Sequence, residues 1–422
     1  MTAAALPSDK ARPAEPAKAD DKPKNFPLRK RTGTAHRRLL SHVVNLGTED
    51  LEKLNDRETV EFMAQARWGS HTFMPCPHCG TLDEHYWDPK RLRWKCKGCG
   101  DTFSVTSATV FADHKLPLNK LLRMALSWSN PAAGRTAIDL RNDFRVAYRT
   151  AFTLAHKLRE GLTRGFNVGI LCGVQEMDGA DLNGKRYREK RNKPLGGGGA
   201  GKPKIPGHLL KPTVDPETGE IMGPPKPPKF DKTAKQPEDR RLMLVMRQRG
   251  LLKGRGAVAT RISIALKEST KTVVAMATKF ASAESHMMSD EDPAYATFSR
   301  LFAAHGTVNH SKTYSAPGGV NNNQAESFNR RMRRAAEGIY LCPSNKYLAD
   351  YACEAAWRED MREPPKGERF AGLLKTALGV GLSRWWRGYW QGHYRTHELL
   401  IEGPQPAKGR GKKPGAAPKV PR

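Results

Sequence analysis

The chain has 422 residues, and its 72 Lys and Arg residues against 43 Asp and Glu residues give a formal net charge of +29. This length excludes a disulfide-stapled miniprotein and allows two or three domains. The charge favours a polyanionic partner such as nucleic acid. No stretch approaches 18 uninterrupted apolar residues, so the sequence predicts no membrane span.

Both ends of the chain are predicted to be disordered and basic. Residues 1–44 form an arm rich in Ala, Pro and Lys, and residues 403–422 carry six basic and no acidic side chains. We expect no signal peptide, because Asp9 and Lys10 follow only a short alanine run. Seven cysteines, four of them in two close pairs, suit a reducing compartment and one metal site.

Residues 45–112 are predicted to form a helical entry followed by a zinc ribbon. Two C-x2-C pairs stand sixteen residues apart, and this spacing lets two tight turns point four thiolates at one Zn²⁺ ion. Because four protein ligands leave no open position, we expect a structural ion. We expect Gly80 and Gly98 to supply the permissive backbone and His78 to face solvent. The predicted ligands are Cys76, Cys79, Cys96 and Cys99.

Residues 86–95, between the cysteine pairs, alternate aromatic and basic side chains. One interpretation is a surface that follows DNA phosphates and includes Lys95. The other is that Trp87 and Trp94 form the small core of the ribbon.

Residues 113–166 read as a helical DNA-binding region. Helical spacing of apolar residues covers 119–129 and 135–161, with a turn expected near Asn142 and Asp143. This pattern is typical either of a helix-turn-helix or of a plain helical bundle with a solvated basic face. The cations on the later helices are Arg141, Arg145 and Arg149.

Residues 167–365 have an α/β pattern in which two predicted strands end at acids. The strand at 167–178 ends at Asp178, strands follow at 241–247 and 257–262, and the strand at 285–290 ends at Asp290. A strand at 306–310 and helices at 323–336, which contains Glu326, and 348–362 complete the pattern. Three such acids can hold two divalent cations, although spacing alone does not show that they meet.

Two segments depart from this pattern. Residues 184–238 form a predicted flexible basic insertion rich in Gly and Pro. Residues 366–402 form a Trp-rich segment that we expect to be helical. Its Arg384–Arg395 stretch either grips DNA by stacking and cation–π contacts or packs as an amphipathic helix against the body.

Several motifs in the same order resemble the DDE transposases of bacterial insertion sequences, in the subgroup with an N-terminal zinc ribbon. The likeness covers roughly residues 50–365. It includes Arg67-Trp68 and Phe103–Phe111 around the ribbon, Glu176–Ala180, Ser289–Glu291, Asn309–Ser311, Asn323–Phe328, Arg330–Arg334 and Trp357–Asp360. The insertion is longer than the family pattern leads us to expect.

The resemblance implies a ribonuclease-H-like mixed sheet with flanking helices, behind the zinc ribbon and the helical region. It implies that Asp178, Asp290 and Glu326 bind two catalytic Mg²⁺ ions, for which Mn²⁺ can substitute. Arg333 matches a cation that contacts DNA near the scissile phosphate, and Arg330 and Arg334 flank it. The other residues considered are Glu176 as a support for the site, Asn323, His310 and Tyr314 as orienting groups, and Asp181, Glu291 and Asp292 as nearby acids outside the triad.

The function expected from this resemblance is binding of terminal inverted repeats, two-metal DNA cleavage and strand transfer. The partners are double-stranded DNA at the element ends and at the target, with a homodimer or higher oligomer forming on DNA in a bacterial cytoplasm. The alternatives are an inactive DNA-binding copy and a nuclease without strand transfer, which shares every catalytic residue.

Overall fold

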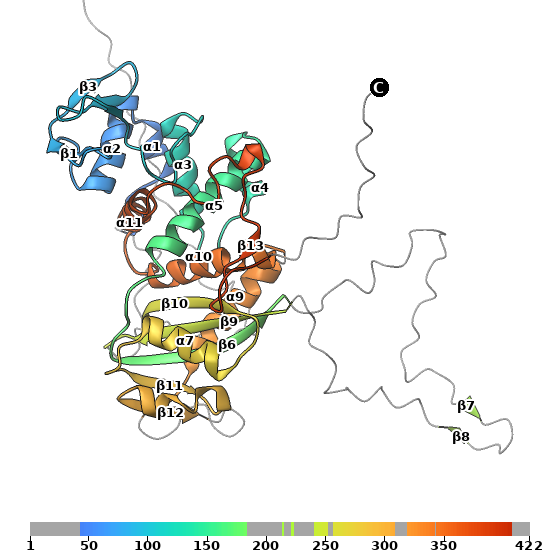
Figure 1. Cartoon of the computed structure of the whole chain (residues 1–422). Coiled ribbons are helices and arrows are strands. Elements are labelled where there is room, and N and C mark those ends of the chain that lie inside the picture. Colours follow the sequence, from blue (N-terminus) through green and yellow to red (C-terminus); the bar gives the residue numbers. More distant parts are fainter. Residues whose placement is uncertain are drawn as a thin grey trace, which may run out of the picture.

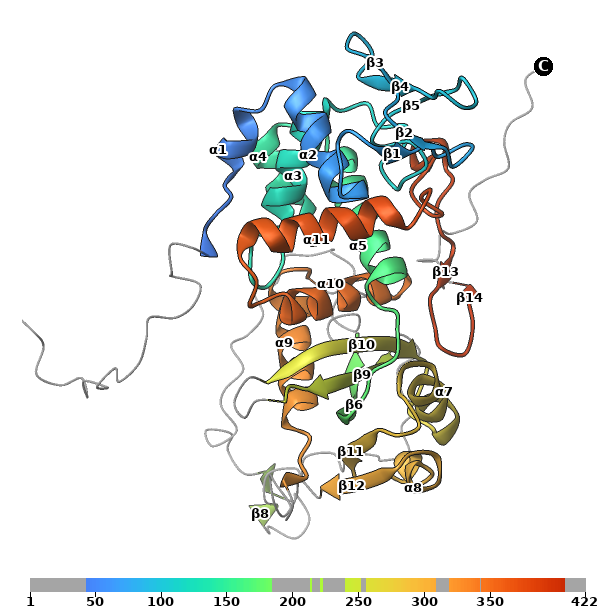
Figure 2. The same cartoon turned by 90° about the vertical axis from the view of Figure 1, so that its left-hand side faces the viewer.

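The computed structural model describes residues 43–183, 213–214, 221–222, 240–251, 256–308, 319–341 and 343–406 (Figure 1). Nearly all of the expected N-terminal arm, most of the insertion and most of the C-terminal tail lie outside the described residues. A zinc-ribbon and helical part lies at one end of the molecule, and a five-stranded sheet lies at the other (Figures 1 and 2).

The ribbon part begins with helices α1 (Thr48–Glu52) and α2 (Asp56–Trp68). Asn55 caps α2 by accepting the Glu58 N–H, and Gly69 ends the helix in the left-handed conformation. Strands β1 (Met74–Pro75) and β2 (Leu82–Asp83) form one antiparallel pair. Strands β3 (Tyr86–Asp88), β4 (Arg93–Lys95) and β5 (Thr102–Phe103) form a second antiparallel sheet.

Helices α3 (Leu118–Ser129), α4 (Ala137–Phe144) and α5 (Tyr148–Gly165) follow the ribbon. The turn expected near Asn142 and Asp143 comes slightly later in the chain, because both residues lie inside α4. The chain turns at Arg145, whose φ of 47° is left-handed, and α5 begins three residues later.

The main sheet has the order β10-β9-β6-β11-β12. Strand β9 is antiparallel to both of its neighbours, whereas β6, β11 and β12 are parallel. This order and these directions confirm the ribonuclease-H-like mixed sheet. Its strands are β6 (Val174–Leu182), β9 (Arg241–Arg249), β10 (Ala257–Ala265), β11 (His286–Asp290) and β12 (Ala304–Val308), and a separate hairpin is formed by β7 (Thr213–Val214) and β8 (Ile221–Met222).

Helices cover both faces of the sheet. Helix α7 (Thr270–Phe280), the 3-10 turn η4 (Pro293–Tyr295) and α8 (Phe298–Leu301) pack on one face, where Met177 of β6 is buried. Helices α9 (Asn323–Gly338) and α10 (Leu348–Asp360) pack on the other face against Ala180 and Leu182 (Figure 2). The alternation along β6 therefore points Asp178 toward α9.

The C-terminal part contains α11 (Lys366–Gly379), η7 (Tyr389–Gln391) and the pair β13 (His397–Glu398) and β14 (Gln405–Pro406). The expected amphipathic helix over the Trp-rich stretch is wrong. Gly388 and Gly392 have φ values of 72° and 86°, so the chain reverses at both ends of η7. The stretch nevertheless packs against the body, since Trp386 is buried.

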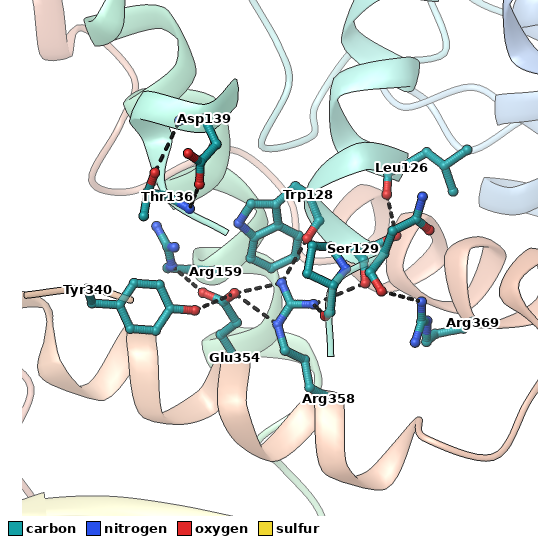
Figure 3. Close-up of polar contacts among 12 residues, drawn as sticks. Leu126, Trp128, Ser129, Thr136, Asp139, Arg159, Tyr340, Glu354, Arg358 and Arg369 are labelled. Atoms are coloured by element: carbon teal, nitrogen blue, oxygen red, sulfur yellow. Dashed lines mark hydrogen bonds and ion pairs between the residues drawn. The ribbon is translucent and has the colours of Figure 1, made fainter. Parts of the chain in front are cut away.

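One hydrophobic core joins the ribbon, helices α2 to α5, α10 and α11. A polar cluster around Glu354 of α10 reinforces this junction (Figure 3). Arg159 of α5 donates to Glu354 at 2.7 Å, and Arg358 donates to the same carboxylate and to carbonyls at the end of α3. No helix in the described part of the chain is long and apolar enough to span a membrane.

Candidate functional site

The four cysteines of the ribbon converge on one point. Their sulfur atoms all lie within 4.8 Å of one another, with Cys76 and Cys99 at 3.9 Å and Cys79 and Cys96 at 3.6 Å. A tetrahedral ion with Zn–S bonds near 2.3 Å requires sulfurs about 3.8 Å apart. The predicted ligand set therefore has the geometry of a structural Zn²⁺ site.

Of the two glycines expected to supply a permissive backbone, Gly80 does so and Gly98 does not. Gly80 and Gly100 hold equivalent left-handed positions with φ of 77° and 76°, so Gly100 takes the role assigned to Gly98. Gly98 instead gives room to Thr81, whose hydroxyl would lie 2.5 Å from an added Cβ. His78 is exposed, as predicted.

The aromatic residues of the ribbon mainly build its core. Trp94 is buried and contacts Trp68, Trp87 and Phe103 with ring centroids 5.0 to 5.8 Å apart. This packing favours the core interpretation of the tryptophans. Lys95 is exposed beside this core on β4.

Asp178 and Asp290 lie where β6 and β11 separate. The parallel pairing of these strands ends at Glu176 and Met288, two residues before each acid. Burial, and next the negative charge of Asp290, raise the pKa of Asp178 to about 7. Two carboxylates that oppose each other's ionisation in this way are suited to share a cation.

Helix α9 brings Glu326 to the same side of the sheet. Asn329, one turn after Glu326, donates from its side-chain amide to Asp178 at 2.7 Å. The side-chain carbonyl oxygen of Asn329 is buried without a hydrogen-bond partner. Glu326 and Asn329 share one flank of the helix. The carboxylate oxygens of the three triad acids do not, however, all lie within 4.8 Å of one another. Among the described residues, the four cysteines are the only group of possible metal ligands that meets this limit.

Glu176 fixes the start of α9. Its fully buried carboxylate accepts the backbone N–H groups of Gln324 at 2.6 Å and Ala325 at 3.2 Å. Arg249 donates to Glu176 at 2.5 Å and also holds the carbonyls of Gly319 and Asn321. Glu176 thus positions the helix that carries Glu326.

A fourth carboxylate lies on the opposite face of β6. Glu268 accepts the Tyr295 hydroxyl at 2.6 Å, and its oxygens would lie 2.7 and 2.9 Å from a Cβ added to Gly179. Burial and the charge of Asp290 raise the pKa of Glu268 despite the Tyr295 hydrogen bond. Sequence reasoning missed both Glu268 and Asn329, although the three-residue spacing from Glu326 could have indicated Asn329.

The cations predicted to bind DNA occupy different surfaces. At 3.6 residues per turn, Arg333 lies about 20° around α9 from Glu326 and about 10 Å along it. Arg330 is exposed close to the same flank. Arg334 instead lines a pocket of about 580 Å³ between α9 and α10, together with Arg331 and Arg362.

Three more predicted cations follow the path from α4 to α5. Arg141 on α4, Arg145 at the turn and Arg149 in the first turn of α5 are all exposed. The rest of α5 is largely buried against α10 and α11. The arrangement presents only the beginning of α5 to a ligand.

The other acids considered from the sequence, and the expected orienting residues, lie in different surroundings. Exposed Asp181 pairs with Arg240, and Asp292 accepts the Ala294 N–H at the start of η4. Glu291 and Asn323 are exposed. His310 and Tyr314 lie outside the described residues.

Comparison with known protein families finds a match in each of the two parts of the molecule. Residues 219–360 match the ISXO2-like transposase domain, and residues 54–102, which contain all four cysteines, match the transposase zinc-ribbon domain. Asp290, Glu326 and Arg333 fall within the first match, whereas Asp178 precedes it. No curated protein and no solved structure matches the chain. The chain thus carries both a transposase zinc-ribbon domain and an ISXO2-like DDE transposase domain of the insertion-sequence transposases.

Proposed function

We propose that the protein cleaves the terminal inverted repeats of an insertion sequence and joins the freed ends to target DNA. The observation that carries this proposal is that Asp178 and Asp290 lie at the fork between β6 and β11, with Asp178 hydrogen-bonded to Asn329 on the helix of Glu326. Burial and the charge of Asp290 disfavour ionisation of Asp178, which a divalent cation would reverse.

The residues fit two hard cations. Asp178, Asp290 and Glu326 supply carboxylate oxygens, the ligands that Mg²⁺ prefers and Mn²⁺ accepts. Bound there, the ions would supply Lewis acidity at the scissile phosphate. Asn329 orients the Asp178 carboxylate, and Glu176 holds the start of α9, so the protein groups are positioned before DNA arrives.

The cations define two proposed DNA contacts. Arg141, Arg145 and Arg149 surround the exposed start of α5, in the manner of a recognition helix, and would bind the terminal repeats. Arg330 and Arg333 would hold phosphates beside the acids. Lys95 on the ribbon and Arg334 in the pocket between α9 and α10 would contact DNA from two further surfaces. Because two ends must be brought together, we propose a homodimer or higher oligomer on DNA.

The decisive experiment is a Mg²⁺-dependent assay on labelled duplex DNA that carries the element's own ends. Wild type should give cleaved and joined products, and Asp290→Ala should give neither while binding DNA equally well. Asp181→Ala is the matched control, because this exposed acid lies on β6 but pairs with Arg240.

The other outcomes separate the competing functions. Cleaved product without joined product from the wild type would make the protein a nuclease. Binding without cleavage by either protein would make it an inactive DNA-binding copy. Equal loss in the Asp290 and Asp181 variants would contradict the assigned site.

A further inference from the structure

The C-terminal segment places exposed aromatic rings beside the start of α5. Trp390 is 56% exposed, Tyr394 50% and Tyr148 47%. Together with Arg149 and Lys346 these residues form what we call the aromatic-basic surface. Residues 366–406 lie outside the matched transposase domain, which ends at residue 360. In Figure 1 this red part of the chain lies beside the green helices α4 and α5.

Ring contacts make most of this surface continuous. Tyr148 stacks on Phe152 at 5.7 Å, and Phe152 lies 6.3 Å from Tyr389, which lies 6.1 Å from Tyr394. The Lys346 ammonium group lies 4.8 Å from the centre of the Tyr394 ring. Trp390 is the next residue after Tyr389 within η7. The start of α5 and the C-terminal segment thus share one outer face.

Buried polar contacts hold the segment in place on both sides of the exposed rings. Before them, the Ser383 hydroxyl donates to Glu160 of α5 at 2.6 Å. After them, Arg395 donates to Asp350 of α10 at 2.7 Å. Both members of the Arg395–Asp350 ion pair have side chains only 1% exposed. The rings are therefore presented by a fixed backbone, which lowers the entropy lost when a ligand binds.

The charge of this surface selects an anionic partner. Residues 383–397 contain no acidic residue, and their exposed cations are Arg384 and Arg387, of which Arg387 pairs with Asp113. The first turn of α5 also lacks acids, and Arg149 lies within it. Exposed rings that alternate with cations bind nucleic acid by stacking on bases and attracting phosphates. Bases inside a duplex are already stacked on one another, so free ring faces suit unpaired bases.

We propose that the aromatic-basic surface binds unpaired nucleotides of single-stranded DNA that extends from the duplex held at the start of α5. This inference rests on the proposed function for the duplex contact, and it adds recognition of the single-stranded part. A junction between duplex and single strand is the DNA feature that these adjacent surfaces fit together.

The test uses fluorescence anisotropy with the full chain carrying Asp290→Asn, so that no DNA is cut during titration. The probes are a labelled blunt duplex of the element end and the same duplex with a single-stranded extension. Trp390→Ala and Tyr394→Ala should each weaken binding of the extended duplex about tenfold, while blunt duplex changes less than about twofold. Trp390→Phe should restore most of the affinity, because a ring remains for stacking.

Tyr86→Ala is the matched control, since Tyr86 is a 64% exposed tyrosine on the ribbon. Equal loss on both probes, or no loss on either, would overturn the inference. A change of oligomeric state in the Trp390 variant without an effect on DNA would also overturn it, in favour of a protein interface. Each of these failures leaves the proposed function intact if the wild type still cleaves and joins DNA. Conversely, if the single-stranded extension strengthens binding but the wild type does not cleave, only the proposed function is contradicted.

Discussion

Two carboxylates in this protein, fully buried Glu354 and half-buried Asp178, have opposite surroundings. Glu354, at the junction of the helical part and the sheet part, receives hydrogen bonds from Arg159, Arg358 and Tyr340 (Figure 3). Burial alone would raise its pKa, but the two arginine charges hold the pKa of Glu354 below its ordinary value. Asp178 receives neutral donors, from Asn329 and the Gly179 N–H, and its pKa is raised to about 7.

This difference in surroundings distinguishes the structural site at Glu354 from the site at Asp178, which is suited to bind a ligand. At Glu354 the protein supplies the compensating cations itself, so the cluster is complete within the folded chain. At Asp178 burial and Asp290 disfavour the charged form, and a cation from solution would relieve both effects. We therefore expect substitutions at the two positions to change stability in opposite directions.

The largest expected effect is at Glu354. Glu354→Ala would leave Arg159 and Arg358 buried without their carboxylate, and removal of one partner of a buried ion pair costs about 3–5 kcal/mol. Urea unfolding followed by tryptophan fluorescence would measure this loss. The control is Glu61→Ala, which breaks the partly exposed pair with Arg57 and should cost less than about 1 kcal/mol. Similar losses in both variants would contradict a structural role for the Glu354 cluster.

Asp178→Asn should instead stabilise the protein when Mg²⁺ is absent. The raised pKa means that folded protein keeps a proton that unfolded protein has lost between about pH 4 and pH 7, so wild-type stability falls as pH rises through this window. The variant escapes this loss. A pKa raised by about three corresponds to about 4 kcal/mol, and the partial solvent exposure of Asp178 lowers the expected gain at pH 8 to about 2 kcal/mol.

Urea unfolding at pH 8 and pH 5, in Mg²⁺-free buffer without chelator so that zinc is retained, would measure this gain. The advantage of the variant should shrink as the pH falls toward 4. Asp181→Asn, at an exposed position on the same strand, should show no such gain. If the Asp178→Asn variant were as stable as wild type at both pH values, the raised pKa of Asp178 would be contradicted.

A smaller effect is expected at Asn329, where the protein orients Asp178. Asn329→Leu removes the amide that donates to this carboxylate, and loss of a group that orients a metal ligand typically lowers activity or metal affinity 10- to 100-fold. DNA cleavage measured across Mg²⁺ concentrations should show a higher half-saturating concentration. Ser327→Ala on the same helix is the control. A lower rate with unchanged Mg²⁺ dependence would point to a general packing defect.

Local sequence patterns predicted some of the residues that come together in this protein and could not predict others. The cysteine spacing predicted the observed cluster, and the strand predicted to end at Asp290 is β11. The strand expected at 167–178 is β6, but it begins at Val174 and continues past Asp178 to Leu182, so the predicted end at Asp178 is wrong. In contrast, Arg159 and Glu354 are 195 residues apart in sequence. Nothing in their neighbouring residues indicates that they meet, because packing of α5 on α10 creates the contact.

The sheet order illustrates the same limit. Periodicity indicates where strands lie but not which strands pair, and the ribonuclease-H-like order was expected only through the family resemblance. The segment at 366–402 was predicted to be helical, and its first part is the helix α11, whereas left-handed Gly388 and Gly392 give the Trp-rich part a different course. Roles for the triad acids and for the arginines remain predictions until the assays above are done.

The smallest expected effect tests whether the site at Asp178 does take up a cation. Binding to the folded state alone stabilises it by RT ln(1 + [Mg²⁺]/Kd), or about 1.4 kcal/mol at ten times the Kd. Wild type at pH 8 should therefore gain stability with added Mg²⁺ in urea unfolding, as should Asp181→Asn. Asp178→Asn and Asp290→Asn should lose this gain, because each removes a proposed ligand. Glu354→Gln should keep it, since the Glu354 carboxylate is already neutralised by two arginines. An equal response in all variants would place the Mg²⁺ site elsewhere and remove the distinction between the two carboxylates.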